Sequence, residues 1–381
     1  MKTVVLSRIG ECSASEWNAL AGDYPFLRHE FLSALEDSGS ASERSGWQPQ
    51  HVTLYDQQGL AAAAPLYEKS HSWGEFVFDF AWARAAEQAG LSYYPKLVCS
   101  VPFTPATGPR LLCRPDLPAE ALRSTLLRTL REHARSAERS SIHALFLDEA
   151  TRSACQQEGW LLRRDCHFQW HNRGYRDFAD FLDRFSADKR KKVRRERRRV
   201  LEQGIEFVTL HGHELDERLL ESVYGFHALT FLRHGHVPYL NRDCFARLAR
   251  TLAPQLMVKL ARRGREPLAA AVFFRSSDTL YGRYWGAEGE HHSLHFEACY
   301  YQGIDYCIEQ GLTRFEPGTQ GEHKIARGFE PVRTWSAHWI AYPPLRRAIE
   351  SYLTREGDAI EAYAGEAGQH VPFREDEREA P

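Results

Sequence analysis

Two matching strand–turn–strand segments, one in each half of the chain, constrain the fold more than any other feature of the sequence. In the first half, apolar runs at His51–Tyr55 and Leu60–Tyr67 are joined by a short polar turn with glycine, which is a hairpin signal. Leu256–Leu260 and Leu268–Phe274 are joined in the same way. The second strands, LAAAAPLY and LAAAVFF, resemble each other closely. Packing convergence on small residues is one explanation, but duplication explains the whole unit better and predicts two similar α/β modules.

The rest of the pattern supports two domains. Helical spacing over Leu117–His133 is followed by a buried strand at Ile142–Leu147, and a helix ending at Gly311 is followed by a strand at Thr313–Glu316. A length of 381 residues also suits two domains. We expect an N-terminal domain over 1–165, a C-terminal domain over 166–353, and a flexible acidic tail over 354–381, where charge is high and periodicity is lost.

Composition excludes several classes of protein. The chain carries 49 basic and 51 acidic residues, so its net charge of −2 gives no global attraction for nucleic acid or membrane. Its longest apolar runs are far below the roughly 20 residues of a transmembrane helix, and the N-terminus lacks the pattern of a signal peptide. The eight cysteines form no C-x-x-C pair and no zinc spacing, which indicates reduced thiols. We therefore expect a cytoplasmic protein without disulfides.

A strongly basic segment is the most unusual local feature. Lys189–Arg199 holds nine bases in eleven residues, within a predicted helix over 187–203. Val193 and Val200 form its only apolar stripe, so one thin edge can face a core. Glu196 is the only acid and cannot neutralise the basic face through i,i+4 pairs. The segment is either a solvated helix or a site for a polyanion such as RNA or a nucleotide diphosphate.

Residues 281–340 are the richest in groups suited to catalysis. A predicted helix carries a polar stripe at i, i+4 and i+8, formed by Glu297, Tyr301 and Asp305. A later loop brings together Glu322, His323 and Lys324, an acid, a base and a cation in successive positions. A carboxylate there could accept a proton from an attacking amine, and Lys324 could stabilise an oxyanion. The alternative is a surface loop whose polar residues face water.

Other kinds of site have less support. Residues 318–321, GTQG, lack the Gly-Lys-Ser/Thr ending of a phosphate-binding loop. His291, His292, His295 and Glu297 do not have a metal-binding spacing, so we expect surface histidines and no bound metal. The chain has no Gly-x-Ser-x-Gly motif, and no Gly-x-Gly-x-x-Gly follows a strand. These absences disfavour an α/β-hydrolase and a dinucleotide-binding fold.

Over about residues 20–345, the chain resembles the FemAB-like branch of the GNAT acyltransferase superfamily, in particular a bacterial group of predicted N-acyltransferases. The segments that carry the resemblance are HSWGEFVFDFAWA (71–83), YYPKL (93–97), PFTPATGPRLL (102–112), HFQW (167–170), FSADKRKKVRRER (185–197), LYGRYWG (280–286), HFEACYYQGIDYCIEQGL (295–312) and GEHKIARGFEPVRTWSAHW (321–339). The resemblance implies an α/β (α+β) fold of two tandem GNAT-like domains, each a mixed central sheet flanked by helices.

The resemblance also implies a reaction. FemAB relatives transfer an amino acid from aminoacyl-tRNA to an amine of a peptidoglycan precursor, and other members of the superfamily use acyl-CoA. The usual GNAT pyrophosphate loop, Gln/Arg-x-x-Gly-x-Gly/Ala before a helix, is not visible here. Its absence disfavours ordinary acetyl-CoA chemistry and leaves the basic helix as an anchor for a phosphate-rich donor. In the relatives a lysine late in the second domain stabilises the reacting carbonyl, and Lys324 is the nearest candidate.

We therefore hypothesise an N-acyltransferase with an amine acceptor, either a small molecule or a peptide such as a cell-wall precursor. Acyl-CoA or aminoacyl-tRNA would be its co-substrate, and we expect no bound cofactor. The candidate catalytic residues are Lys324, Glu322, Glu297 and His323. The candidate substrate-binding residues are Arg283, Tyr284, Trp285, Tyr301, Gln320 and Arg327. The candidate donor-phosphate-binding residues are Lys189, Arg190, Lys192, Arg194 and Arg195.

A second hypothesis from another class is a catalytically silent GNAT-like module that binds an anionic glycopeptide or RNA. In that case the basic helix controls affinity, and no donor yields an acylated product. The donor, the acceptor, the oligomeric state and a peripheral contact with the inner membrane stay open at this point.

Overall fold

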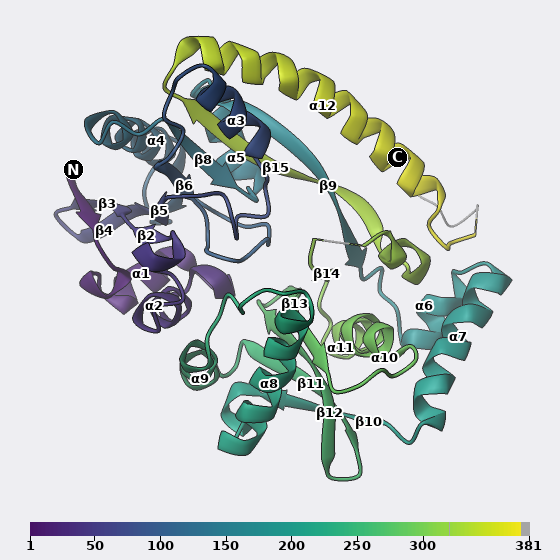
Figure 1. The fold of residues 1–381 in the computed structure, drawn as a ribbon. Helices are drawn as coiled ribbons and strands as arrows, with labels where there is room; N and C mark the ends of the chain where they lie inside the picture. Colours follow the sequence, from purple (N-terminus) through teal and green to yellow (C-terminus); the bar gives the residue numbers. More distant parts are fainter. Residues whose placement is uncertain (320, 375–381) are drawn as a thin grey trace. The chain divides into compact units, whose positions relative to one another are not determined.

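The computed structural model describes residues 1–319 and 321–374. The chain divides into two compact units (Figure 1). The first unit comprises Met1–Asp165 and Arg333–Glu361, and the second comprises Cys166–Val332 and the chain from Ala362 onward. Residues 333–353, which the sequence pattern assigns to the second domain, therefore group with the first unit. Every helix in the described ranges is too short or too polar to span a bilayer.

The first unit contains two sheets. One is antiparallel and has the order β1-β3-β4-β7, formed by Lys2–Leu6, His51–Asp56, Gly59–Ala64 and Leu112–Cys113. Pro65 follows β4, and because proline lacks a backbone N–H, it ends that ladder. The second sheet has the order β15-β8-β6-β5-β2, formed by Glu330–Ile340, Ser141–Leu145, Lys96–Cys99, Leu66–Lys69 and Gln48–Pro49. Its β6 and β8 run parallel, so this sheet is mixed.

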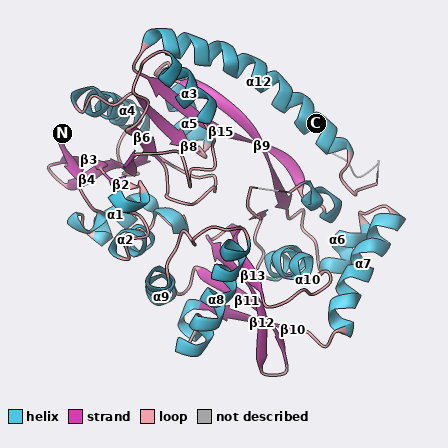
Figure 2. Ribbon diagram, in the orientation of Figure 1, coloured by secondary structure: helices cyan, strands magenta, loops and turns pink. Residues whose placement is uncertain are grey.

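Helices cover these sheets (Figure 2). They are α1 (Ala14–Ala21), α2 (His29–Asp37), α3 (Phe80–Gln88), α4 (Ala119–Ser136) and α5 (Glu149–Gln157). The apolar side of α4, with Leu126, Leu127 and Leu130, is fully buried in a core shared with β3, β4, β6 and β8. The alanines of β4 are also fully buried against α1 and α4. Small side chains there allow a close helix–sheet approach, which is a physical reason for the LAAA pattern.

The second unit is built around one mixed sheet of order β10-β11-β12-β13-β14-β9. Its strands are Glu206–His211, Leu256–Arg263, Glu266–Arg275, Thr279–Ala287, Arg314–Glu316 and Leu161–His171. Only the β13–β14 pair among these is parallel. Along β13, Arg283 is the extra residue of a β-bulge, because Tyr284 pairs with Val272 while Gly282 pairs with Phe273.

The helices of the second unit include α6 (Phe178–Asp183), α7 (Ala187–Glu202), α8 (Glu217–Arg233) and α9 (Arg242–Thr251). After β13 come α10 (Leu294–Phe296), a π-helical turn over Glu297–Tyr301 and α11 (Gln302–Glu309). A 3₁₀ helix spans Glu322–Arg327. Gly286 of β13 allows α8 to pack closely, because a Cβ at this position would lie 1.8 Å from the carbonyl oxygen of Phe226.

The structure confirms the α/β fold with mixed sheets and flanking helices, and both predicted hairpins form. The predicted flexible tail is wrong over residues 354–369, which lie in α12 (Pro343–Gln369). This helix buries Leu345, Ile349 and Leu353 at i, i+4 and i+8. Residues 375–381 of that predicted tail lie outside the described part. All eight cysteines are free thiols, as expected.

Candidate functional site

Lys324 is the most unusual side chain of the second unit. It lies in the 3₁₀ helix after β14, is 1% exposed, and its Nζ donates a hydrogen bond of 2.5 Å to the carbonyl oxygen of Gly318. Burial lowers the pKa of Lys324 to about 7. Because its partner is a neutral carbonyl, this ammonium can either lose its proton near neutral pH or stabilise a negative charge that develops beside it.

Glu297 is a buried carboxylate of this unit. Its Oε1 accepts hydrogen bonds from Arg197 (3.1 Å) and Gln302 (2.9 Å), and Arg197 also pairs with Asp305 at 2.6 Å. Within the described part of the chain, Glu297 Oε2 is buried and has no hydrogen-bond partner. Burial raises the pKa of Glu297, while Arg197 opposes the shift. Glu297 begins the π-helical turn, a distortion that frequently occurs at functional sites.

Arg327 and Tyr301 meet at a third buried group, Glu196 of α7. Arg327 Nη2 lies 3.0 Å from both carboxylate oxygens of Glu196, and the Tyr301 hydroxyl donates to the same carboxylate at 2.5 Å. The Arg327 guanidinium also lies 3.4 Å from the centre of the Phe296 ring. Glu196, the only acid between Lys189 and Arg199, thus points inward and fixes the loop that carries Lys324. The sequence analysis singled out both partners but did not link them to Glu196.

Glu322 and His323, the two residues before Lys324, are more exposed than Lys324. Glu322 is exposed, and its Oε1 accepts a 3.0 Å hydrogen bond from the Tyr363 hydroxyl. His323 is also exposed, and its Nε2 lies 2.8 Å from the Tyr300 hydroxyl. Burial lowers the pKa of His323, with Lys324 adding to the effect. Glu297 is therefore better placed than Glu322 to act as a buried base.

The three candidates on β13 do not point the same way. The Tyr284 ring lies 4.6 Å from that of His227 on α8, whereas the Trp285 ring lies 5.5 Å from that of His295 on α10. Arg283 is half-buried at the bulge between them. Trp285 is connected, through His295, to the ring of His323. Gln320, the remaining substrate-binding candidate, lies outside the described residues.

The predicted basic helix is α7, and Val193 and Val200 are buried as its apolar stripe predicts. Four of the five donor-binding candidates are exposed: Lys189, Lys192, Arg194 and Arg195. The fifth, Arg190, is half-buried and pairs with Asp183 at 3.1 Å. The basic face is therefore solvent-accessible and carries more charge than its neighbouring acids balance.

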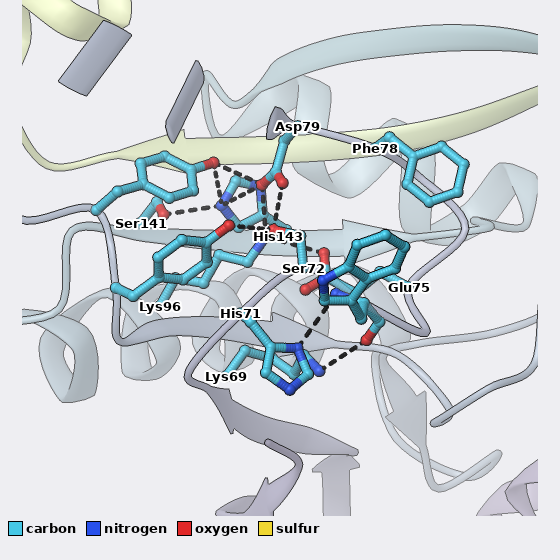
Figure 3. Close-up of polar contacts among 12 residues, drawn as sticks. Lys69, His71, Ser72, Glu75, Phe78, Asp79, Lys96, Ser141 and His143 are labelled. Carbon is cyan, nitrogen blue, oxygen red and sulfur yellow. Dashed lines mark hydrogen bonds and ion pairs between the residues drawn. The ribbon is translucent and has the colours of Figure 1, made fainter. Parts of the chain in front are cut away.

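A second polar cluster, which the sequence analysis missed, lies in the first unit (Figure 3). Its centre is the fully buried Lys96, whose Nζ donates to Ser72 (2.8 Å), Glu75 (2.9 Å) and Asp79 (2.5 Å). Burial alone would lower the pKa of Lys96, but the two carboxylates raise it above its usual value. The Ser72–Lys96 contact has the form of a catalytic serine–lysine pair. Because Lys96 keeps its proton, it cannot serve as the base of such a pair.

Lys69 lies beside this cluster and behaves differently. Its Nζ donates to the Trp73 carbonyl oxygen at 3.1 Å and lies 3.9 Å from the centre of the Trp47 ring. Burial lowers the pKa of Lys69 to about 7, and burial raises that of Glu75 to about 7. The available signal was in the resemblance segments HSWGEFVFDFAWA and YYPKL, where Glu75, Asp79 and Lys96 are isolated charges among aromatic residues.

The mixed sheets flanked by helices, with the bulged β13 beside the parallel β14, form a GNAT-type fold. The chain belongs to the FemAB-like family, described as acting in peptidoglycan biosynthesis/recognition, whose family model matches residues 8–375. The resemblance noted from the sequence is thereby confirmed.

Two solved structures with similar folds show how far the similarity extends. FemX has a TM-score of 0.54 and 13% identity, covering 92% of this chain and 100% of the FemX chain. L-PGS from Bacillus licheniformis has a TM-score of 0.51 and 12% identity, covering 86% of this chain and 96% of that one. At these identities the similarity shows the fold alone. No curated protein sequence matches the chain.

Proposed function

We propose that the chain is an N-acyltransferase that moves an aminoacyl or acyl group from an activated donor to an amine acceptor. A peptide precursor of the cell wall is the acceptor that best fits the family's role in peptidoglycan biosynthesis. The observation that carries the proposal is Lys324, a buried lysine whose pKa is lowered to about 7 and whose ammonium is held by a neutral carbonyl. The electrostatic stabilisation that such an ammonium provides is largest when a negative charge develops beside it.

The proposed reaction assigns a role to each group of the second unit. The acceptor nitrogen attacks the donor carbonyl carbon, the new C–N bond forms, and Lys324 stabilises the oxyanion. Glu297, whose Oε2 has no hydrogen-bond partner among the described residues, takes the proton that the nitrogen loses. The C–O bond of an ester donor, or the C–S bond of a thioester, then breaks, and the proton passes to the leaving oxygen or sulfur. Arg327 and Tyr301 hold the loop through Glu196.

Aminoacyl-tRNA is the donor that we favour, with acyl-CoA as the alternative. The exposed bases of α7 suit an extended phosphate backbone, since each phosphate contact adds affinity without sequence selection. Both donors are made in the cytoplasm, which is where we expect the protein to act.

The direct test replaces Lys324 by alanine and measures product by mass spectrometry, with charged tRNA and acyl-CoA each supplied together with cell-wall precursors. Loss of one oxyanion donor should lower turnover by about 10²–10³. The control is Lys259→Ala, which removes another buried lysine of the same unit, on β11. The control should keep the activity of its folded fraction. Normal turnover in Lys324→Ala would refute the role of Lys324.

The silent binding module remains the second candidate, because α7 presents bases whether or not a reaction follows. The ratio of absorbance at 260 and 280 nm of purified protein separates the cases when combined with the product assay. Salt-releasable nucleic acid without any acylated product supports the binding module, whereas product formation excludes it.

A further inference from the structure

The segment between β5 and α3, residues 70–79, is a loop without regular structure that is held unusually firmly. Ser72, Glu75 and Asp79 all bind the ammonium of Lys96, and Ser72 also donates to Asp79 at 2.5 Å (Figure 3). These three contacts tie three positions along the segment to one buried ammonium, although Glu75 Oε1 has no hydrogen-bond partner among the described residues. Phe76 has a φ of 62°, a left-handed conformation that is unfavourable for phenylalanine. The network therefore fixes one strained conformation of this loop.

The fixed loop presents aromatic side chains to solvent. Trp73 is 58% exposed and Phe78 is 49% exposed. Each packs on Phe80, with ring centres 5.3 Å apart for Trp73 and 5.7 Å apart for Phe78, the latter pair being stacked. Trp73, Phe80 and Phe78 thus form a continuous aromatic strip. Contiguous exposed aromatic surface usually marks a binding site, whereas single exposed rings need no explanation.

A pocket lies next to this strip. It has a volume of about 290 Å³, and its polar lining includes Glu43, Gln48, Glu68, Ser70 and Tyr94. His71 connects the pocket to the strip. Its Nδ1 accepts a hydrogen bond from the Trp73 backbone N–H (3.2 Å), and its Nε2 lies 2.5 Å from the position of a Cβ at Gly46, which also lines the pocket. The surface therefore combines flat apolar faces with hydrogen-bonding groups.

The charges around the strip favour an uncharged ligand. Two bases reach the backbone of the strip: the buried Lys69 donates to the Trp73 carbonyl oxygen, and Arg163 donates to the Phe78 carbonyl oxygen and pairs with Glu356. Because one base is buried and the other is paired, they give the described part of the strip no exposed basic cluster to attract the headgroups of an anionic membrane. Aromatic faces carry a partial negative charge that attracts the slightly positive C–H groups of a pyranose ring. The hydroxyl and amide groups of a sugar are neutral partners for the carboxylates and hydroxyls of the pocket.

We propose that the aromatic strip and its pocket form a saccharide-binding site in the first unit. Successive pyranose rings stack on Trp73, Phe80 and Phe78, and their polar substituents bind in the pocket. This inference goes beyond acyl transfer and does not depend on it, since saccharide binding needs no donor. If the proposed function also holds, the glycan portion of the acceptor occupies this site.

The test titrates N-acetylchitotriose into the full chain without any acyl donor and follows binding by calorimetry and tryptophan fluorescence. Trp73→Ala should weaken binding by about tenfold, the loss expected for one stacking ring, and Phe78→Ala should weaken it by a smaller factor. Tyr342→Ala is the matched control, because Tyr342 is 45% exposed but lies outside the strip. Its affinity should equal that of the unmodified protein, as should that of Lys324→Ala.

Three outcomes overturn the proposal. The first is that the unmodified chain does not bind the trisaccharide. The second is that Trp73→Ala and Phe78→Ala both bind it with the affinity of the unmodified protein. The third is that the chain sediments with phosphatidylglycerol–phosphatidylcholine vesicles in a Trp73-dependent way and does not bind saccharide. Melting curves establish whether each variant is folded. If Trp73→Ala does not fold, Phe78→Ala serves as the test. Inactive acyl transfer together with normal saccharide binding would refute only the proposed function.

Discussion

At the scale of single residues, Lys69, Lys96 and Lys324 are each at most 1% exposed, yet their surroundings give them different chemistry. Lys96 contacts two carboxylates and keeps its proton, whereas the pKa values of Lys69 and Lys324 are lowered to about 7 because burial is opposed only weakly. An opposite charge within hydrogen-bond distance stabilises the ammonium, and a carbonyl group does so much less. Lys96 therefore suits a structural role, and Lys324 suits a catalytic one.

The titration of Lys324 predicts how acyl transfer depends on pH. Its ammonium form, which stabilises the oxyanion, predominates below the pKa of about 7 and is lost as the pH rises through it. We therefore expect kcat/KM, measured from pH 5.5 to 9, to fall on an alkaline limb centred near 7. In Lys324→Arg the residual activity should lack this limb, because guanidinium does not titrate in this range. A rate that increases through pH 7 in the unmodified enzyme would instead make Lys324 a general base.

The candidate site was only partly predictable, and particular residues show why. The triplet Glu322–Lys324 stood out because three functional groups are adjacent in sequence, and the structure buries only Lys324 among them. Glu75, Asp79 and Lys96 are separated in sequence, and an isolated charge usually faces solvent. These three residues come together because the 70–79 loop folds back onto β6. The periodicity of the local sequence does not predict such a long-range contact.

Helix α7 shows the same limit at the scale of an element. Seven-residue spacing correctly identified Val193 and Val200 as its buried edge. Glu196 lies on that edge as well and pairs with Arg327, although a lone acid among bases suggests a surface ion pair. The basic face keeps an excess of positive charge because Glu196 pairs with Arg327 in the interior and not with the bases of that face. Helical periodicity predicts which face is buried but not which distant residue a buried charge meets.

Glu196→Ala should destabilise the second unit strongly. It leaves the guanidinium of Arg327 buried without its carboxylate and removes the acceptor of the Tyr301 hydroxyl, a loss on the order of 3–5 kcal/mol. Glu202→Ala on the same helix is the control, since Glu202 is exposed and pairs with Arg198 at the surface, and it should change stability by less than about 0.5 kcal/mol. Urea unfolding midpoints measure both. Equal midpoints would contradict the structural role of Glu196.

The exposed face of α7 allows a separate prediction about the donor. Replacing Lys189, Lys192 and Arg195 by glutamine should weaken tRNA binding and reduce the slope of log K against log salt by about 2–3, if each base contacts one phosphate. Arg347→Gln combined with Arg355→Gln removes exposed bases from α12 and serves as the control. An unchanged slope in the α7 variant would exclude this helix as the phosphate anchor, and titration at several salt concentrations supplies the measurement.

At the scale of the whole molecule, the repeated hairpins were sufficient to predict two α/β modules, because turn chemistry and strand alternation are local. The C-terminal end was not predictable in the same way. Glu, Gly and Ala after residue 353 resemble the composition of a flexible tail, yet Ala and Glu also favour helices. The helix that forms there is held by contacts from distant segments, such as the ion pair between Arg163 and Glu356 at 2.7 Å.

Phe373 provides the sharpest test that the C-terminal segment belongs to the fold. It is 3% exposed, its ring lies 5.5 Å from that of Phe185, and the Arg184 guanidinium lies 5.4 Å from its centre. Phe373→Ala should cost about 3–5 kcal/mol, because it removes a buried aromatic ring from the core of the second unit. His370→Ala, three residues earlier and exposed, should have almost no effect. Urea midpoints that are the same for both variants would show that the segment is peripheral, whereas a large difference would show that the second unit requires residues well beyond the expected domain end at 353.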